Sequence, residues 1–170
     1  DPEFESFTYG DPTGPKQGLK RLGSGDLLVF YAGLEGWGGC KTPAGLYIIG
    51  YFVIEHAGTY KCLCEHLNRK NVHKVFAKNW HILNHDTDNQ DKLILIKGDR
   101  SSSRLLKKAV RISSNERATD AGGHPVDVLD PKMQKHFGTF TDLNAITRSI
   151  PRWVKPEFCD KASKFVIKLR

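Results

Sequence analysis

The sequence predicts an α+β fold in which a small, curled mixed β-sheet or β-barrel carries short peripheral helices. Two neighbouring apolar runs, 27–34 and 46–55, are rich in aromatic and β-branched side chains and lie close to glycine-rich turns. Such runs are typical of buried strands at the centre of a sheet. Shorter apolar runs at 93–96, 109–112 and 165–169 predict further strands. Five or so strands with interspersed short helices favour this fold class.

The first third of the chain is expected to hold one short helix and the two long strands. The helix is predicted over 15–22, because its proline suits a first turn and Leu19 and Leu22 would both face inward. The strand at 27–34 then leads through a Gly/Pro-rich loop to the second strand, which we extend over 46–57.

The middle of the chain is expected to alternate helices with polar loops. Residues 60–79 predict two helical pieces, because their apolar side chains recur three and four residues apart. A polar loop is expected over 84–91, followed by the strand at 93–96. The serines at 101–103 are then expected to cap a short helix over 104–108.

The last third is expected to hold a loop, a helix and a closing strand. Residues 114–127 are polar and contain a Gly-Gly pair, which predicts a loop. A short helix is expected over 131–137, and the alternating run at 165–169 predicts the closing strand. We expect residues 1–170 to form a single domain. Because the sequence does not begin with methionine, we also expect part of the native N-terminal region to be missing.

Composition and charge point to a soluble protein with a polyanionic partner. No apolar run reaches about 18 residues, so no membrane span is expected. The four cysteines give little support for a disulfide framework, and reduced thiols in a cytoplasmic protein are expected. Residues 1–99 contain 11 Lys/Arg against 12 Asp/Glu, whereas residues 100–170 contain 15 against 7. This uneven charge predicts a surface that faces nucleic acid, with a merely solvated basic face as the alternative.

Three segments of the chain carry a family resemblance: Phe7–Pro12, Gly25–Leu34 and Ser103–Val110. Together with the strand at 46–55 they span most of the first two thirds of the chain. In combination they resemble the third type of nucleotide modification associated domain. The resemblance implies a role beside systems, including defence systems, that make or read modified bases, and it implies no particular reaction.

A looser resemblance links the chain to PUA-like barrels, including the EVE and YTH-type readers of modified bases. It rests on the order of a Gly-Asp turn, an apolar strand, a Phe-Tyr pair and a second apolar strand that begins near glycine. Segment 104–113 would correspond to their late helix-to-strand segment. This resemblance implies an aromatic pocket that accepts a flipped base. The loop at 35–45 and the long stretch after 114 depart from the compact pattern, so the wall of that pocket stays open.

Aromatic side chains near turns and strand ends are the candidates for base binding. Three rings are predicted to form the stacking walls: Tyr9, Tyr31 and Trp37. Stacking on such a ring contributes ~1–3 kcal/mol per base. Asp11 precedes a proline in extended or turn backbone, from which its carboxylate could read the edge of a flipped base. The alternatives are ordinary packing for the rings and capping of the next turn for Asp11; Trp80 and Trp153 are expected to be structural.

The segment after residue 98 carries the candidate phosphate contacts. They are Arg100, Ser103, Arg104 and Lys107. Cations and a hydroxyl near a helix start suit phosphate, because free backbone amides and the helix dipole favour an anion there. The alternative is a capped and solvated helix.

Metal-binding and catalytic signals are weaker. Zinc-type donors occur in two groups: Cys62, Cys64 and His66, and His81 with His85, Asp86 and Asp88. Neither group has the spacing of a standard zinc site. No nucleophile elbow, phosphate loop or dinucleotide fingerprint is present, so no cofactor is expected.

We therefore predict a nucleic-acid-binding domain that recognises a modified base. DNA is expected as partner in preference to RNA, and proteins of a modification system are possible further partners. One alternative is an enzyme that acts on modified bases or nucleic acid, with a metal or general base among Asp11, His81, His85, Asp86 and Asp88. The other is a scaffold domain that binds only partner proteins.

Overall fold

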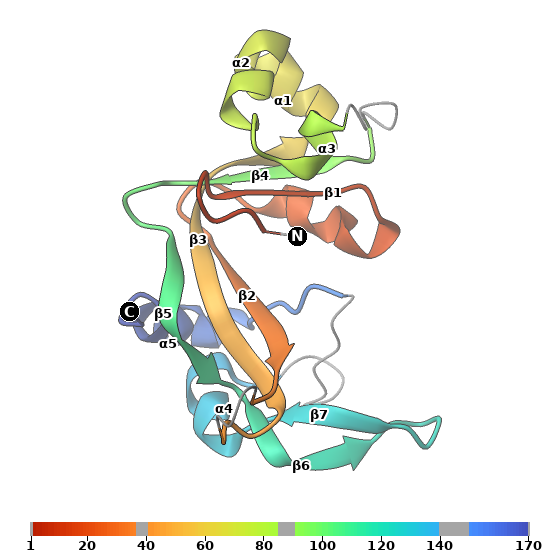
Figure 1. Ribbon diagram of the computed structural model, residues 1–170, viewed down its shortest axis with the longest axis vertical. Helices are drawn as coiled ribbons and strands as arrows, with labels where there is room; N and C mark the ends of the chain where they lie inside the picture. Colours follow the sequence, from red (N-terminus) through yellow and green to blue (C-terminus); the bar gives the residue numbers. More distant parts are fainter. Residues whose placement is uncertain (1, 37–40, 85–90, 140–149, 170) are drawn as a thin grey trace. The chain divides into compact units, whose positions relative to one another are not determined.

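The computed structural model describes residues 2–36, 41–84, 91–139 and 150–169 of the chain (Figure 1). These residues form a mixed α+β fold with a curled antiparallel sheet and several short helices, which confirms the predicted fold class. Within this part of the chain, every helix is too short or too polar to cross a membrane.

The main sheet has five strands: β1 (Thr8–Asp11), β2 (Leu27–Leu34), β3 (Gly45–Thr59), β4 (Ile94–Gly98) and β5 (Arg104–Arg111). The order is β1-β4-β3-β2, and β5 also pairs with β3. Strand β4 lies between β1 and β3 and is antiparallel to both, so that Ile96 is opposite Tyr9 on one side and Ala57 on the other. A bulge between Ile54 and His56 bends β3. The two long strands predicted from the sequence are thus β2 and β3.

The residues of the chain contact one another in two compact units. The first consists of Asp1–Leu28 and Tyr51–Leu105, and the second of Val29–Gly50 and Leu106–Arg170. Strands β2, β3 and β5 each begin in one unit and end in the other. The single domain expected over residues 1–170 stays a prediction.

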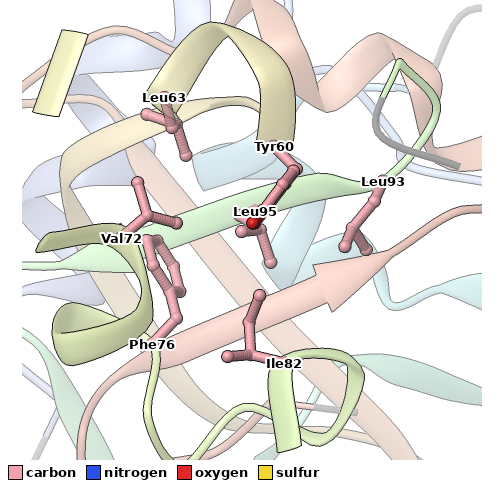
Figure 2. Packing of buried hydrophobic residues seen from close by; sticks show 7 residues of the cluster. All are labelled: Tyr60, Leu63, Val72, Phe76, Ile82, Leu93 and Leu95. Carbon is pink, nitrogen blue, oxygen red and sulfur yellow. The ribbon is translucent and has the colours of Figure 1, made fainter. Parts of the chain in front are cut away.

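In the first unit, three short helices cover a core built on β4. They are α1 (Tyr60–Leu67), α2 (Arg69–Val75) and α3 (Trp80–Leu83). Each begins with a side-chain cap: Thr59 accepts from Cys62 N, Asn68 from Asn71 N, and Asn79 from His81 N. Figure 2 shows the buried cluster that holds them: Tyr60, Leu63, Val72, Phe76, Ile82, Leu93 and Leu95.

The same unit contains the helix predicted near the start of the chain. It is a 3-10 helix, η1 (Gly14–Arg21), with proline in its first turn. Leu19 and Leu22 are both buried, as expected from their spacing. The helices α1 and α2 likewise confirm the two helical pieces predicted over 60–79.

The second unit contains a hairpin and two packed helices: β6 (Ser113–Thr119), β7 (Pro125–Leu129), α4 (Pro131–Phe137) and α5 (Pro156–Val166). Helix α4 confirms the prediction for 131–137, and Asp130 caps it by accepting from Lys132 N at 2.8 Å. The α4–α5 contact is aromatic: the His136 ring stacks on Phe165 with centroids 4.2 Å apart, and Phe137 meets Phe165 edge-on.

Two sequence predictions are wrong because tertiary pairing outweighs local preference. Residues 104–108 form the first part of strand β5 and not a capped helix. Their Arg, Leu and Lys residues favour helix intrinsically, but this preference is weak and the pairing with β3 overrides it. Residues 114–127, predicted as a loop, form most of the β6–β7 hairpin around the turn at Gly122-Gly123.

The closing strand predicted at 165–169 is also wrong. Helix α5 extends to Val166, and a turn follows it. Pro156 occupies the first turn, where proline is tolerated, and the buried Ala162 and Val166 lie four residues apart on one helix face. The alternating pattern of the last residues is too short to distinguish a strand from the end of an amphipathic helix.

Candidate functional site

Tyr9 and Asp11, two of the predicted base-binding residues, are joined by a hydrogen bond at the end of β1. Tyr9 Oη donates to Asp11 Oδ2 at 2.9 Å. Asp11 Oδ1 accepts from Thr13 N at 2.8 Å and also from the Thr13 hydroxyl, which closes a turn typical of aspartate. These hydrogen bonds fix the direction of the Asp11 carboxylate. Asp11 is half-buried, so part of it is accessible to solvent.

The Tyr9 hydroxyl is a permanent donor in this pair. The residue is only 7% exposed, and its burial raises the pKa of the phenol above the ordinary value. The negative charge of Asp11 and the hydrogen bond to it raise that pKa further. Tyr9 therefore orients Asp11 and offers little ring surface for stacking.

Gly10 provides room on the opposite face of β1, since neighbouring residues of a strand point to opposite faces. A Cβ atom there would lie 2.7 Å from Asn79 Oδ1 and 3.0 Å from His81 Cδ2. The absence of a side chain thus lets the start of α3 pack directly on β1. His81, a candidate general base of the enzyme alternative, lies on this face of β1.

The other two predicted stacking residues belong to the second unit. Tyr31 lies in β2 and is half-buried; burial raises the pKa of its hydroxyl, and the positive charge of Arg152 opposes that shift. Trp37 lies outside the described residues, as do His85, Asp86 and Asp88. The structure thus brings Tyr9 and Asp11 together, and their relation to Tyr31 and Trp37 stays a prediction.

The turn before β5 is held by one aspartate. Asp99 Oδ1 accepts from Ser101 Oγ at 2.6 Å and from Ser102 N at 2.9 Å, and these bonds keep the pKa of the Asp99 carboxyl below its usual value. The carbonyl of Asp99 accepts from Ser103 N at 2.8 Å. The serines therefore form a turn and not a helix cap, so no helix dipole is available to a phosphate here.

Ser103 serves the fold directly. It is 2% exposed, and its Oγ accepts from Val53 N on the neighbouring strand at 3.0 Å. Its phosphate-binding role stays a prediction.

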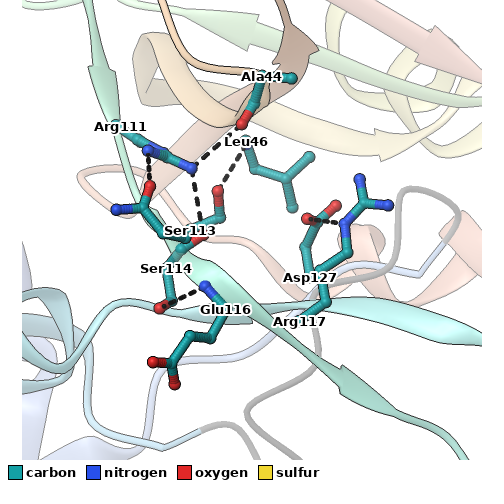
Figure 3. A network of polar contacts seen from close by, with 9 residues as sticks. Ala44, Leu46, Arg111, Ser113, Ser114, Glu116, Arg117 and Asp127 are labelled. Carbon is teal, nitrogen blue, oxygen red and sulfur yellow. Dashed lines mark hydrogen bonds and ion pairs between the residues drawn. The ribbon is translucent and has the colours of Figure 1, made fainter.

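Cations follow this turn along β5. Arg100, Arg104, Lys107 and Lys108 are exposed. Arg111, at the end of the strand, is different: its guanidinium donates to the carbonyls of Ala44 and Ser114 and to Asn115 Oδ1 (Figure 3). Arg111 thus ties β5 to its neighbours, whereas the four cations before it are exposed.

The zinc-type donors that the structure describes lie apart from one another. Among the residues that the structure describes, no group of three His, Cys, Asp or Glu side chains is placed to hold a metal ion. Cys62 and Cys64 are half-buried on α1, and the nearby His73 bonds instead to the Tyr60 hydroxyl, with Nε2 and Oη 2.8 Å apart.

Two tryptophans that were expected to be structural are exposed. Trp80, expected to be structural, is 64% exposed on α3, and Leu83 is 59% exposed on the same short helix. Trp153, also expected to be structural, is 40% exposed in the second unit. One feature of the sequence could have drawn attention to Trp80: residues 66–84, which include it, contain no Asp or Glu.

The family model for nucleotide modification associated domain 3 matches residues 1–166 of the chain. The chain belongs to this family. The matched region includes every base-binding and phosphate-binding residue predicted above, from Tyr9 to Lys107. No curated protein and no solved structure gives a significant match. The resemblance to PUA-like barrels therefore stays a prediction, whereas membership in the nucleotide modification associated domain 3 family is established.

Ser103 allows the fold and the predicted phosphate contact to be separated. We expect Ser103→Ala to lower the free energy of unfolding by about 1–2 kcal/mol, because it leaves the half-buried Val53 N–H without an acceptor. Urea denaturation measures this change. Ser102→Ala is the control, since Ser102 is exposed and keeps its backbone bond to Asp99. Equal stability of the two variants would contradict the structural role of the Ser103 hydroxyl.

Proposed function

We propose that this nucleotide modification associated domain binds nucleic acid, DNA in preference to RNA, and recognises a modified base. One observation carries the proposal: the exposed cations of the turn and β5. Arg100, Arg104, Lys107 and Lys108 lie within nine residues and make no ion pair with any other described residue. Unpaired cations at this density suit phosphates, which supply most of the affinity of nucleic-acid binding.

The charge of the second unit supports the same partner. It contains 14 Lys/Arg against 8 Asp/Glu, whereas the first unit contains 12 against 11. Such an excess raises the local concentration of a polyanion and accelerates its association.

Base recognition is assigned to two groups of side chains, one in each unit. In the first unit, the fixed Asp11 carboxylate accepts hydrogen bonds from the edge of an extruded base, and Tyr9 positions it. In the second unit, Tyr31 and Trp37 supply stacking faces. Each group is tested by its own variants.

The phosphate part of the proposal is tested by removing three cations. We expect the variant Arg100→Ala/Arg104→Ala/Lys107→Ala to weaken binding of every oligonucleotide. Each lost phosphate contact lowers the slope of log affinity against log salt by about 0.7 for a single strand and about 0.9 for a duplex. Fluorescence anisotropy at several salt concentrations measures both quantities.

The matched control removes the same charge from η1 through Lys16→Ala/Lys20→Ala/Arg21→Ala. We expect the control to retain more of the salt slope than the β5 variant. Equal slopes for the two variants would show that only net charge matters. Absence of binding to any oligonucleotide by the unaltered protein would refute the proposed function.

The base-recognition part is tested with matched plain and base-modified oligonucleotides. We expect Asp11→Asn and Tyr31→Ala each to reduce the preference for the modified oligonucleotide while salt-dependent binding of the plain one is kept. Competition binding at fixed salt measures the preference, with Asp120→Asn, in the β6–β7 turn, as a control for the loss of one carboxylate. A preference unchanged in both variants would remove these residues from the base site.

A further inference from the structure

The helical layer of the first unit (residues 66–84) has a positive net charge, whereas the rest of that unit has a negative one. Residues 66–84, from the end of α1 to the end of α3, contain four Lys/Arg, three His and no Asp or Glu. The remainder of the first unit contains 8 Lys/Arg against 11 Asp/Glu. A one-signed segment within an acidic surrounding indicates a surface with an anionic partner.

Two lysines of this segment are available to such a partner. Lys70 and Lys74 are exposed and lie four residues apart on α2, away from Val72, which is fully buried. Neither makes an ion pair with a residue in the described part of the chain. Lys78 differs, because it pairs with Glu5.

The following helix presents a flat ring. Trp80 is 64% exposed, although the backbone that carries it is firmly held. The buried Asn79 caps α3 by accepting from His81 N at 3.2 Å, and Ile82 packs in the core cluster that also contains Val72 of α2 (Figure 2). The His81 ring and the indole are nearly perpendicular, with centroids 5.1 Å apart, and they form an edge-to-face pair.

We infer that the outer surface of α2 and α3 is a second nucleic-acid contact, where Trp80 stacks on an unpaired base and Lys70 and Lys74 neutralise phosphates. This inference rests on the proposed function and adds a preference for single-stranded or locally opened nucleic acid. A base stacks on a protein ring only when its own face is free, which excludes an intact duplex. Leu83, exposed beside Trp80, extends the apolar surface under such a base.

Charge and size distinguish this partner from an anionic membrane. Surface-bound helices bury a long apolar face in the lipid boundary. Helix α3 has only four residues, and it exposes two large apolar side chains, Trp80 and Leu83. An exposed ring, together with unpaired lysines in the same helical layer, matches the way in which single strands are held, base by base.

The ring is tested with Trp80→Ala and Trp80→Phe in the full chain. We expect Trp80→Ala to weaken binding of a short single-stranded DNA by about tenfold, within the range measured for base–aromatic stacking. Trp80→Phe should keep most of the affinity, and affinity for the matching duplex should stay unchanged in both variants. Thermal melts should also stay unchanged, because the side chain is exposed.

The lysines are tested with Lys70→Ala/Lys74→Ala. We expect the salt slope for single-stranded DNA to fall by about 1.4, since each lost phosphate contact removes about 0.7. The control is Lys16→Ala/Lys20→Ala, which removes two lysines with the same spacing from η1. An equal slope change in the control would contradict a specific role for α2.

The outcomes separate this inference from the proposed function. If Trp80→Ala binds single strands normally while the β5 variant does not, the second contact is refuted and the proposed function stands. If Trp80→Ala and Lys70→Ala/Lys74→Ala lose single-strand binding while the β5 variant does not, the second contact stands and the β5 site is refuted. Trp80-dependent binding to anionic phospholipid vesicles but not to DNA would overturn the inference in favour of a membrane surface.

Discussion

Replacing Phe76 by alanine is expected to lower the free energy of unfolding by about 3–5 kcal/mol. Phe76 is fully buried in the cluster beneath α1, α2 and α3, where it packs beside Val72 and Ile82 (Figure 2). Removing its ring exchanges many close contacts for a cavity that the short helices can only partly close. Because domains have a net stability of about 5–15 kcal/mol, this loss is a large share of the total. Urea denaturation followed by circular dichroism measures it.

Leu83→Ala is the control for Phe76→Ala. Leu83 belongs to the same helical layer but is 59% exposed, so its truncation should change stability by no more than about 0.5 kcal/mol. A Phe76→Ala variant as stable as Leu83→Ala would contradict the packing of the three helices on β4.

Gly138→Ala is expected to destabilise the second unit by about 3 kcal/mol, through two separate effects. Gly138 ends α4 with φ +68° and ψ −166°, a backbone region populated essentially by glycine, which costs another residue about 1–3 kcal/mol. A Cβ atom there would also lie 2.5 Å from Cδ2 of Phe158 on α5, which forces the ring to move. Thermal unfolding with a calorimetric enthalpy measures the loss.

Two other glycines separate the effects at Gly138. Gly123 has φ +82°, and a Cβ atom added there would meet no other atom within 4 Å, so Gly123→Ala reports backbone strain alone. Gly14 lies in η1 with open space and no positive φ, so Gly14→Ala should be nearly neutral. If Gly138→Ala is no worse than Gly123→Ala, the contact with Phe158 contributes nothing.

The elements with long or regular hydrophobic patterns could be predicted from the sequence. The run at 27–34 matches β2 residue for residue, and the buried positions of α1 and α2 follow the helical spacing of their apolar residues. In these segments local preference and burial agree, so either one identifies the structure.

The wrong predictions lie where local preference and tertiary contacts disagree. Residues 104–108 favour helix by themselves, and only their pairing with β3 makes them a strand. Helix α5 was missed because its buried face is formed by few residues and depends on the aromatic contact of Phe165 with α4. Neither partner can be identified from the local sequence.

In the candidate site, too, the contacts of single side chains could not be predicted from the local sequence. The Asp-Pro pair predicts extended or turn backbone at Asp11, and Asp11 ends β1 and accepts from Thr13 N in the turn that follows. The hydrogen bond from Tyr9 depends on the alternation of β1, which the sequence analysis did not predict. Ser103, a candidate phosphate contact, is 2% exposed, and Trp80, expected to be structural, is 64% exposed. The exposure of a side chain depends on which helices and strands pack over it. The residue types around it in the sequence do not specify those elements.

The chain crosses from one unit to the other three times, and this has a consequence for protein engineering. All of them, at residues 28–29, 50–51 and 105–106, fall inside hydrogen-bonded strands. Neither unit can therefore be expressed as one uninterrupted fragment. A chimaera that exchanges one unit for that of a relative would have to exchange both of its chain segments together.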